Sequence, residues 1–291
     1  MGYKAIYAYA WDVAEVGASE AAGRFASLGL DTITIAGSYH AGKFLRPHGE
    51  TGRVFFPEDG SVYFNADPRR YGAVKPVANS MLKERDVLRE LTDQRRINVN
   101  VWLVLLHNTL LGTRHPDATV ANAFGDRYCY SLCPSAPEAR AYAIGLARDV
   151  TEAYPVTGVS LETPGFLPFA HGYHHEFALN RPNRWLDSQL GLCFCRHCVN
   201  GAKAAGIDAD ALKAQVAGDV DAYLASEIDF PVDMAESLAR RHAQRRRIES
   251  LPRLALLRRD LAGARDPQRG AQGRDGRGHS IGGAADGGSL V

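Results

Sequence analysis

Three cysteines crowd into the short segment 193–198, in the pattern C-x-C-x-x-C. Thiolates suit structural zinc sites, in which four ligands surround the ion as a tetrahedron and leave no coordination position open. Cys133, which a proline follows, is the best remote fourth ligand, and His197 and Cys129 are its substitutes. The sequence therefore predicts a structural zinc ion bound by Cys133, Cys193, Cys195 and Cys198.

The cysteine count supports a metal site over a disulfide framework. The chain has five cysteines, an odd number, and three of them lie too close in sequence for a typical disulfide pattern. A radical-type iron–sulfur cluster would need a wider first spacing. These features also suit a reducing compartment, so we expect a cytoplasmic protein.

Glu162 is the candidate catalytic residue. It ends the apolar run Val156–Leu161 and is followed by Thr163-Pro164-Gly165, which turns the chain. Hydrolysis of a glycosidic bond needs one carboxylic acid to protonate the leaving oxygen and a second carboxylate as nucleophile or base. Glu162 has the chemistry of the first. The alternative is a carboxylate paired with arginine or lysine at the rim of the fold.

Aromatic and polar side chains follow every predicted strand. Aromatic faces stack on sugar C–H surfaces, and Asp, Asn and His bind hydroxyls by directional hydrogen bonds. The recurrence of such residues after four strands predicts a carbohydrate-binding face. The candidates are Trp11, Asp12, Tyr39, His40, His107, Asn108, Tyr173, His174 and His175.

Elements that would position these residues alternate between strand and helix. Apolar, β-rich runs predict strands, and Ser19, Gly29 and Pro137 lie where a helix cap, a helix end and a helix start are favoured. The predicted strands are Lys4–Ala10, Thr32–Ala36, Asn98–Leu106 and Val156–Leu161; the helices are 19–28, Ser80–Arg95 and Glu138–Glu152; the long loops are Gly37–Pro76 and Asn108–Ser135.

This alternation predicts a parallel sheet of the (β/α)8 TIM-barrel type, of which about four βα units, the N-terminal half, are present. The helix-to-strand turns are short and the strand-to-helix connections are mostly long, as in barrels with their functional face at the strand carboxyl ends. A doubly wound sheet is the alternative. It would carry phosphate-binding glycines after the first strand, where Trp11-Asp12-Val13-Ala14 has none.

A family resemblance rests on the order of three motifs. Cys133-Pro134-Ser135-Ala136-Pro137-Glu138-Ala139-Arg140 precedes a predicted helix, Gly158-Val159-Ser160-Leu161-Glu162 forms a strand, and C-x-C-x-x-C follows it. This order resembles the β-galactosidases of glycoside hydrolase family 42 over about Lys4 to Ile207. The resemblance implies a glycosidase barrel with a cysteine-bound zinc and Glu162 as the general acid/base. Leu161 stands where that family has an asparagine, so the resemblance points to a related family.

Composition changes near residue 236. Residues 1–236 form the predicted partial-barrel catalytic domain, whereas residues 237–291 lack aromatics and lysine and are rich in Arg, Gly and Ala. Such a segment buries too little apolar surface to offset chain entropy, so we expect it to be largely unpacked. It is either a natural basic tail or the product of a frameshift in a GC-rich coding sequence; in the second case the barrel is truncated and inactive.

Charge and hydropathy limit the partners. The 34 Lys and Arg residues nearly balance the 33 Asp and Glu residues, and no apolar stretch reaches the roughly 20 residues of a membrane span. A carbohydrate is thus the expected partner, rather than nucleic acid or a membrane. The alternatives to a glycoside hydrolase are a metal-dependent sugar isomerase using the His174-His175-Glu176 cluster, and a non-catalytic or degenerate carbohydrate-binding barrel.

Overall fold

The computed structural model describes residues 4–172, 183–225 and 280–283. The chain divides into two compact units, each of which is described by itself. The first unit comprises Met1–Leu111, Ala141–Pro164 and Pro267–Val291, and the second comprises Gly112–Arg140 and Gly165–Asp266.

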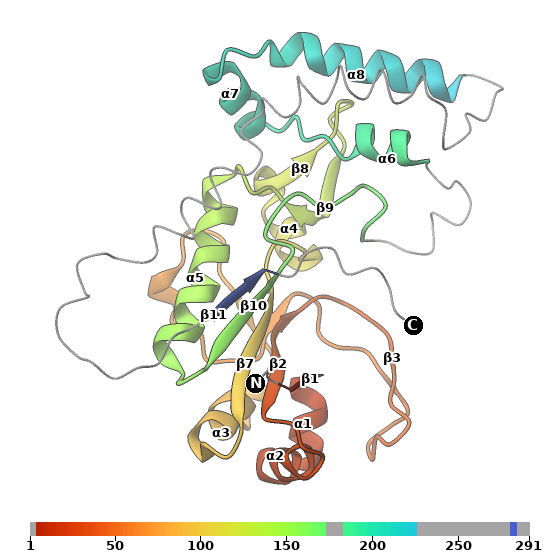
Figure 1. The fold of residues 1–291 in the computed structure, drawn as a ribbon. Helices are drawn as coiled ribbons and strands as arrows, with labels where there is room; N and C mark the ends of the chain where they lie inside the picture. Colours follow the sequence, from red (N-terminus) through yellow and green to blue (C-terminus); the bar gives the residue numbers. More distant parts are fainter. Residues whose placement is uncertain (1–3, 173–182, 226–279, 284–291) are drawn as a thin grey trace. The chain divides into compact units, whose positions relative to one another are not determined.

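A parallel sheet organises the first unit (Figure 1). Its strands β1, β2, β7 and β10 lie side by side in chain order, and every neighbouring pair among them is parallel. All four predicted strands are confirmed in place, with ends shifted by a few residues. They span Ala5–Ala8, Thr32–Tyr39, Asn98–Val104 and Gly158–Glu162. The fold is therefore mixed α/β with a parallel sheet, as predicted, while closure into a barrel stays a prediction.

The two faces of this sheet differ, because successive side chains of a strand point to opposite sides. In β7, Val99, Val101 and Leu103 are buried, whereas Asn100 and Trp102 on the other face are only half-buried. The register places Ile33 and Ile35 of β2 on the face of Val99 and Val101, whereas Thr34 and Ala36 on the other face of β2 are buried too. The buried face packs beneath helices, and the second face is lined by polar and aromatic residues.

The residues at the helix boundaries determine where α1 and α2 of the first unit begin. Predicted strand one is shorter than expected because Ala10 opens helix α1 (Ala10–Val16), and Gly17, with φ of 92°, separates it from α2 (Ala18–Ser27). The prediction that Ser19 caps this helix is wrong, since Gly17 occupies the cap position. Only glycine adopts such a φ without strain, so it sets the break.

The predicted helix Ser80–Arg95 is two elements. A 3-10 turn, η2 (Ser80–Lys83), precedes helix α3 (Val87–Gln94). Asp86 accepts a hydrogen bond from the backbone N of Arg89 and so caps α3, which explains why the regular helix starts there. In the next βα unit, α5 (Pro137–Ala153) confirms the predicted start at Pro137.

The connection predicted as one long loop, Gly37–Pro76, contains regular structure. A hairpin pairs β3 (Phe44–Leu45) with β4 (Val54–Phe55), and η1 (Pro68–Arg70) follows further along. Strand β5 (Ser61–Val62) pairs antiparallel with the end of β2 and parallel with β6 (Val77–Ala78). Strand β2 is thus extended by Ser38 and Tyr39 beyond its predicted end, because β5 supplies backbone partners there.

The second predicted loop, Asn108–Ser135, is also structured. It contains α4 (Thr109–Arg114), η3 (Pro116–Ala118) and a hairpin of β8 (Thr119–Ala121) and β9 (Arg127–Leu132). The turn around Asn122 explains the hairpin, since its Oδ1 accepts hydrogen bonds from the backbone N of Phe124 and of Asp126. Such side-chain acceptance is typical of turns.

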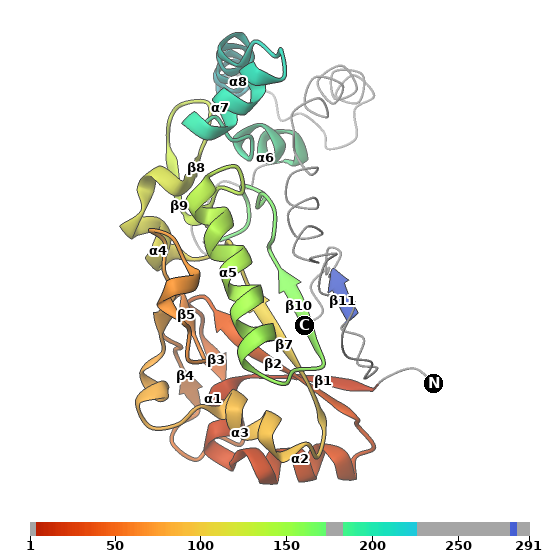
Figure 2. The same ribbon diagram turned by 90° about the vertical axis from the view of Figure 1, so that its left-hand side faces the viewer.

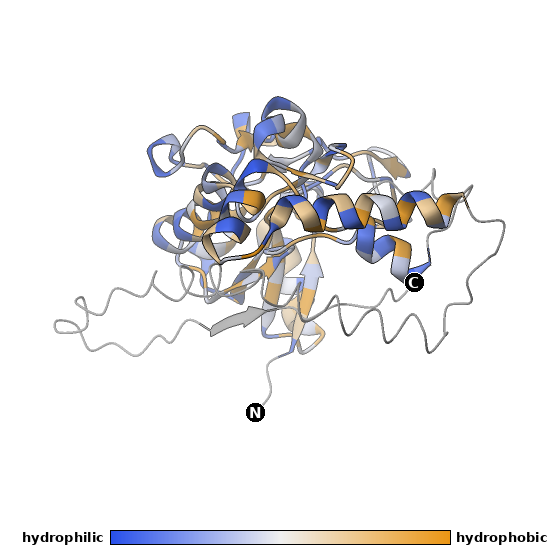
Figure 3. Ribbon diagram, turned by 90° about the horizontal axis from the view of Figure 1, so that it is seen from above, coloured by the Kyte–Doolittle hydropathy of each residue, from blue (hydrophilic) through white to orange (hydrophobic). Residues whose placement is uncertain are grey.

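Helices α6 (Arg184–Leu190), α7 (Arg196–Ala204) and α8 (Ala209–Leu224) complete the described part of the second unit (Figures 1 and 2). Helix α8 buries one stripe of residues at spacings of three or four: Ala209, Leu212, Val216 and Val220. Figure 3 shows hydrophobic and hydrophilic residues alternating along this long helix. Leu212 and Val216 form a small core with Leu192 and Ala123.

Of the predicted tail 237–291, the structure describes only β11 (Ser280–Gly283), which pairs in parallel with β10. These four residues lie in the sheet, which the composition did not indicate. The division at residue 236 and the frameshift stay predictions. Within the described ranges, no helix is long and apolar enough to span a membrane.

Candidate functional site

Glu162 is the last residue of β10 and lies at the carboxyl end of the parallel sheet, level with Val104 of β7. By the alternation of β10 it belongs to the same face as Ser160, opposite the buried Leu161. Its Oε2 accepts a hydrogen bond of 2.5 Å from Nε1 of Trp102. Glu162 is half-buried, so its carboxylate is neither fully hydrated nor sealed in the core.

Aromatic rings surround Trp102 on this face. Tyr7 and Tyr39 meet its ring edge-on, with centroids 5.4 Å and 5.3 Å away and interplanar angles of 85° and 76°. Tyr9 lies 5.9 Å from the same ring. Edge-to-face contacts of this kind are favourable and directional, so the rings hold one another in place beside Glu162.

Two phenol groups lie close together in this cluster. The hydroxyls of Tyr9 and Tyr39 are 3.4 Å apart. Burial raises the pKa of Tyr39 far above its ordinary value, and the hydrogen bond with Tyr9 and the negative charge of Glu162 raise it further. Tyr39 is therefore a neutral phenol at all physiological pH values, able to donate a hydrogen bond to a ligand oxygen.

The predicted residue His40 stacks between Tyr39 and His107, with ring centroids 4.4 Å and 4.3 Å away. Nδ1 of His40 is hydrogen-bonded to the backbone O of Ala41 at 2.6 Å. The structure thus brings together Tyr39, His40 and His107, which come from the ends of two different strands. Imidazole and phenol groups gathered in this way suit the recognition of hydroxyl-rich ligands.

Asn108, another candidate, is occupied by the backbone. Its Nδ2 donates to the backbone O of Gly60 at 3.0 Å, and its Oδ1 accepts from the backbone N of Leu111 at 2.9 Å. The side chain is buried, and Gly60 comes so close that a Cβ there would lie 2.1 Å from Oδ1 of Asn108. These contacts give Asn108 a structural role in starting α4 and fixing the loop before β5; its role in substrate binding is untested.

Trp11 and Asp12 lie in α1 and also make structural contacts. Trp11 is buried, with its ring stacked on Tyr9 at 4.4 Å. Asp12 Oδ1 accepts a hydrogen bond of 2.7 Å from Nε of Arg46, a residue that also pairs with Glu15. Trp11 therefore packs against Tyr9 of the aromatic cluster, and Asp12 helps to hold the β3–β4 hairpin through Arg46. The candidates Tyr173, His174 and His175 lie outside the described residues.

Sequence reasoning missed Tyr9 and Trp102. Tyr7 and Tyr9 are two residues apart and so share one face of strand one, a period-two signal that was present in the sequence. Trp102 falls within the apolar run of strand three, where nothing in the local pattern distinguishes it from a core residue. Its role emerges only from the register that sets β10 beside β7.

The second unit contains the cysteine cluster. Cys133 follows β9, Cys195 is the N-cap residue of α7, and Cys198 lies in the first turn of that helix. The Sγ of Cys133 is 3.8 Å from that of Cys193 and 3.6 Å from those of Cys195 and Cys198. All four sulfurs lie within 4.8 Å of one another.

These separations fit a tetrahedral ion. Zinc–sulfur bonds of about 2.3 Å place the corners of a tetrahedron about 3.8 Å apart, close to the observed distances. A disulfide would need about 2.05 Å, so the four cysteines are present as thiols or thiolates. Neither His197 nor Cys129, the substitute ligands, belongs to the group.

Protons are shared unequally within the cluster. Hydrogen bonds from the surrounding thiols, that of Cys133 first, lower the pKa of Cys195, whereas the hydrogen bond with Cys193 and burial raise the pKa of Cys133. A cation would replace those protons, because thiolates are the metal-binding form.

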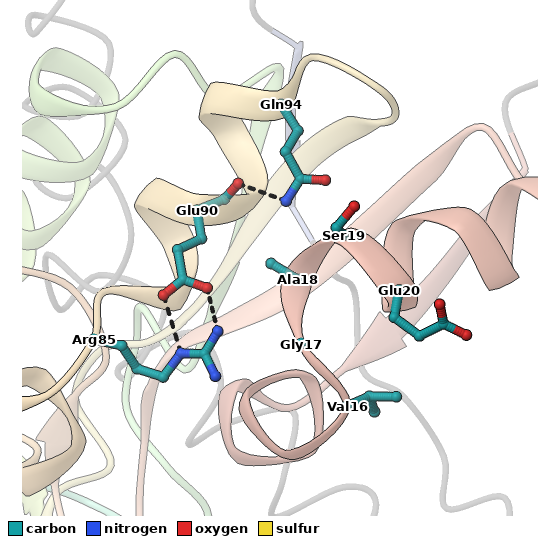
Figure 4. A pocket seen from close by; sticks show the side chains of 8 residues that line it. All are labelled: Val16, Gly17, Ala18, Ser19, Glu20, Arg85, Glu90 and Gln94. Atoms are coloured by element: carbon teal, nitrogen blue, oxygen red, sulfur yellow. Dashed lines mark hydrogen bonds and ion pairs between the residues drawn. The ribbon is translucent and has the colours of Figure 1, made fainter.

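A groove of about 480 Å³ also lies in the first unit, between the start of α2 and α3 (Figure 4). Some of its polar groups are engaged locally: Nε of Arg85 donates to Glu90 at 3.0 Å, and Nε2 of Gln94 donates to the backbone O of Glu90 at 2.9 Å. None of its lining residues comes from the carboxyl end of a parallel strand. The groove is therefore separate from the Glu162 site.

No protein-family model and no curated protein matches the chain. Among solved structures, the chain is similar to α-L-fucosidase isoenzyme 2 from Paenibacillus thiaminolyticus, with 12% identity over 74% of this chain and 29% of that chain and a TM-score of 0.43. A hypothetical protein from Ruminiclostridium thermocellum shares 14% identity over 56% of this chain and 77% of its own, with a TM-score of 0.33.

A further similar structure is the α-galactosidase of glycoside hydrolase family 36 from Geobacillus stearothermophilus in complex with stachyose, with 15% identity, 55% and 21% coverage and a TM-score of 0.33. The chain spans less than a third of the length of the fucosidase and of the galactosidase. At these TM-scores the likenesses assign no fold or activity, so the geometry of the site carries the functional argument.

Proposed function

We propose that the chain is part of a glycoside hydrolase-like enzyme that acts on a carbohydrate, with Glu162 as the proton donor. One observation carries the proposal: a carboxylate at the carboxyl end of a parallel strand, hydrogen-bonded to Trp102 and flanked by Tyr39. A carboxylic acid beside aromatic faces and neutral hydroxyl donors matches what cleavage of a glycosidic bond requires.

The strand order supports the barrel as the setting for this chemistry. In a doubly wound sheet the order reverses beside the first strand, whereas β1, β2, β7 and β10 follow one another without interruption. Sequential parallel strands with helices over one face are what the first half of a (β/α)8 barrel would contain. The face carrying Trp102 and Glu162 would then be the inside of the barrel, and Glu162 would lie at its mouth.

Each side chain has a defined role in this proposal. Glu162 protonates the leaving oxygen of the scissile bond, while Tyr39 and His40 hydrogen-bond sugar hydroxyls. The ring of Trp102, whose Nε1 donates to the carboxylate, gives the sugar an apolar surface. The second carboxylate is not assigned to any residue that the structure describes; barrels of this type supply it from a later strand.

The test is hydrolysis of a panel of p-nitrophenyl glycosides by the full chain and by Glu162→Gln. We expect the variant to keep its circular dichroism spectrum and to lose about 10²–10⁴ in kcat, the usual share of positioned acid catalysis. Glu20→Gln is the matched control, because Glu20 is an exposed carboxylate paired only with Arg24. Unchanged turnover in Glu162→Gln rejects Glu162 as the acid. Sugar binding without turnover by the unmodified chain favours the non-catalytic barrel instead.

We further propose that Cys133, Cys193, Cys195 and Cys198 bind a structural zinc ion. The support is the fit of the sulfur separations to a tetrahedral ion, together with a donor set of four cysteine sulfurs and no other ligand among the described residues. Elemental analysis of the purified protein is the direct measurement, and one zinc per chain is expected. Absence of any metal from protein purified without chelators would contradict this assignment.

A further inference from the structure

Glu162 is constrained through its side chain and, independently, through the backbone of the next residue. Thr163 has φ of 51°, in the left-handed region that a β-branched residue rarely adopts. Its Oγ1 is buried and has no hydrogen-bond partner among the described residues. Strained backbone and unpaired polar groups cost free energy and gather at functional positions, where the surrounding structure enforces them.

The side-chain constraint comes from Trp102. The indole N–H donates to Oε2 of Glu162 at 2.5 Å, and the edge-on contacts with Tyr7 and Tyr39 restrict the ring that carries it. Trp102 and Glu162 lie on adjacent strands, β7 and β10, whose backbone hydrogen bonds fix the spacing between them. A donor held by its own packing imposes its direction on the carboxylate that accepts from it.

We propose that Trp102 is a positioning residue for Glu162: its indole N–H sets the orientation of the carboxylate plane. The catalytic meaning of this role rests on the proposed function. The hydrogen bond itself needs no substrate to be measured. A donor that points at a carboxylate stabilises the charged form relative to the protonated one, so proton loss and uptake at Glu162 must depend on Trp102.

The first experiment uses the indole resonances of the full chain labelled with ¹⁵N. The chain has three tryptophans, so three indole N–H signals are expected, and the one lost in Trp102→Phe belongs to Trp102. We expect that signal to lie downfield of the other two and to follow a single titration with pH. In Glu162→Gln it should move upfield and no longer titrate, because the charged acceptor is gone.

Trp11 is the internal control for this measurement. Its Nε1 is buried without a hydrogen-bond partner among the described residues, so its signal should stay in place in Glu162→Gln. A Trp102 signal that is unchanged in Glu162→Gln would overturn the positioning role. The signal measured in Glu162→Gln comes from the unmodified Trp102 ring, so the result does not depend on how well Trp102→Phe folds.

The second experiment measures turnover of the best glycoside by Trp102→Phe, which keeps an aromatic ring but removes the donor. We expect kcat to fall by about 10- to 100-fold with KM little changed, as for a misplaced catalytic group. The decline of activity at high pH should move to higher pH, since the protonated acid persists longer without the donor. Trp185→Phe, in the second unit, should leave both quantities unchanged.

The two experiments separate the inference from the proposed function. If the indole signal responds to Glu162→Gln but no glycoside is hydrolysed, the positioning contact stands and the proposed function fails. If Glu162→Gln abolishes turnover while Trp102→Phe leaves kcat and the pH profile unchanged, the function stands and the positioning role is overturned.

Discussion

The Glu162 site of the first unit and the cysteine cluster of the second differ in the kinds of side chain that they bring together. The cluster gathers four identical ligands at separations that leave no open coordination position, two of them on the start of α7. The Glu162 site places a single half-buried carboxylate among rings and imidazoles of different chemistry, on the side of the sheet opposite its buried face. Four identical side chains that could fill every coordination position of an ion are suited to a structural site. A single carboxylate among unlike, partly accessible groups is suited to a reaction on a bound molecule.

The largest expected effect is on the cluster. Cys133→Ser should lower the zinc content and unfold the second unit, because structural zinc contributes on the order of 10 kcal/mol to small metal-dependent folds. Limited proteolysis should then cut within residues 112–140 and 183–225 while the sheet of the first unit survives. Cys129→Ser is the control and should behave as the unmodified chain, since Cys129 lies outside the ligand group. Equal protease resistance of Cys133→Ser would show that the cluster does not stabilise this unit.

A smaller loss is expected in the first unit, where Asp149 of α5 anchors the segment that contains η1. The buried Oδ2 of Asp149 accepts hydrogen bonds from the backbone N of Asp67 at 2.7 Å and the hydroxyl of Tyr71 at 2.9 Å, and Arg70 lies 3.4 Å from Oδ1. Asp149→Ala should lower the free energy of unfolding by roughly 3–5 kcal/mol, as for one partner of a buried charged network.

Glu152→Ala is the matched control for Asp149, because Glu152 pairs with the same Arg70 but is exposed. It should cost about 0–1 kcal/mol. Both values can be read from urea unfolding followed by tryptophan fluorescence. If the two variants lose equal stability, the hydrogen-bond network around Asp149 contributes no more than a surface ion pair. The difference in stabilisation between the two units would then come from the cysteine cluster alone.

A change of opposite sign is expected at Thr163. Glycine adopts a left-handed φ without steric cost, so Thr163→Gly should stabilise the protein by about 0.5–1 kcal/mol after the added flexibility of the unfolded chain is counted. Arg95→Gly, at a second non-glycine residue with φ of 51° among those described, should stabilise similarly. Only Thr163→Gly should also lower kcat, since it loosens the residue beside Glu162. The melting temperature and kcat of both variants test these two expectations.

The smallest effect is the acid sensitivity of two partly buried carboxylates. Side-chain and backbone hydrogen bonds with Arg69 hold the pKa of Asp67 at about 2, below its ordinary 3.8, and hydrogen bonds from Thr51 lower the pKa of Glu15 below 4.5. Because both folded values are depressed, their stabilisation is complete above about pH 4.5 and is lost as the pH falls toward 2. Asp67→Asn should flatten the pH dependence of the melting temperature in this range. An unchanged slope would mean that Asp67 makes no net contribution.

The sequence predicted the elements whose signals are local. The four strands, the start of α5 at Pro137 and the cysteine group follow from apolar runs, a helix-starting proline and close cysteine spacing. The β8–β9 hairpin was missed because its strands are short and its turn depends on Asn122. The partnership of Trp102 with Glu162 was missed because it arises from strand register, which joins residues 60 positions apart. Trp11 and Asp12 were placed correctly near a strand end, but packing and Arg46 occupy them.

The sequential order of the strands also determines the order in which contacts can form during synthesis on the ribosome. Contacts between β1 and β2 close over about 27 residues, so the sheet can begin to form as soon as the second strand emerges. Cys133, in contrast, is synthesised 60 residues before Cys193, which corresponds to an interval of roughly 3–12 s at usual elongation rates. During that interval its thiol has none of its final partners. A metal bound by these cysteines, as proposed, could therefore be captured only after all four parallel strands have been synthesised, and conditions that oxidise thiols would act on the nascent chain before the cluster can close.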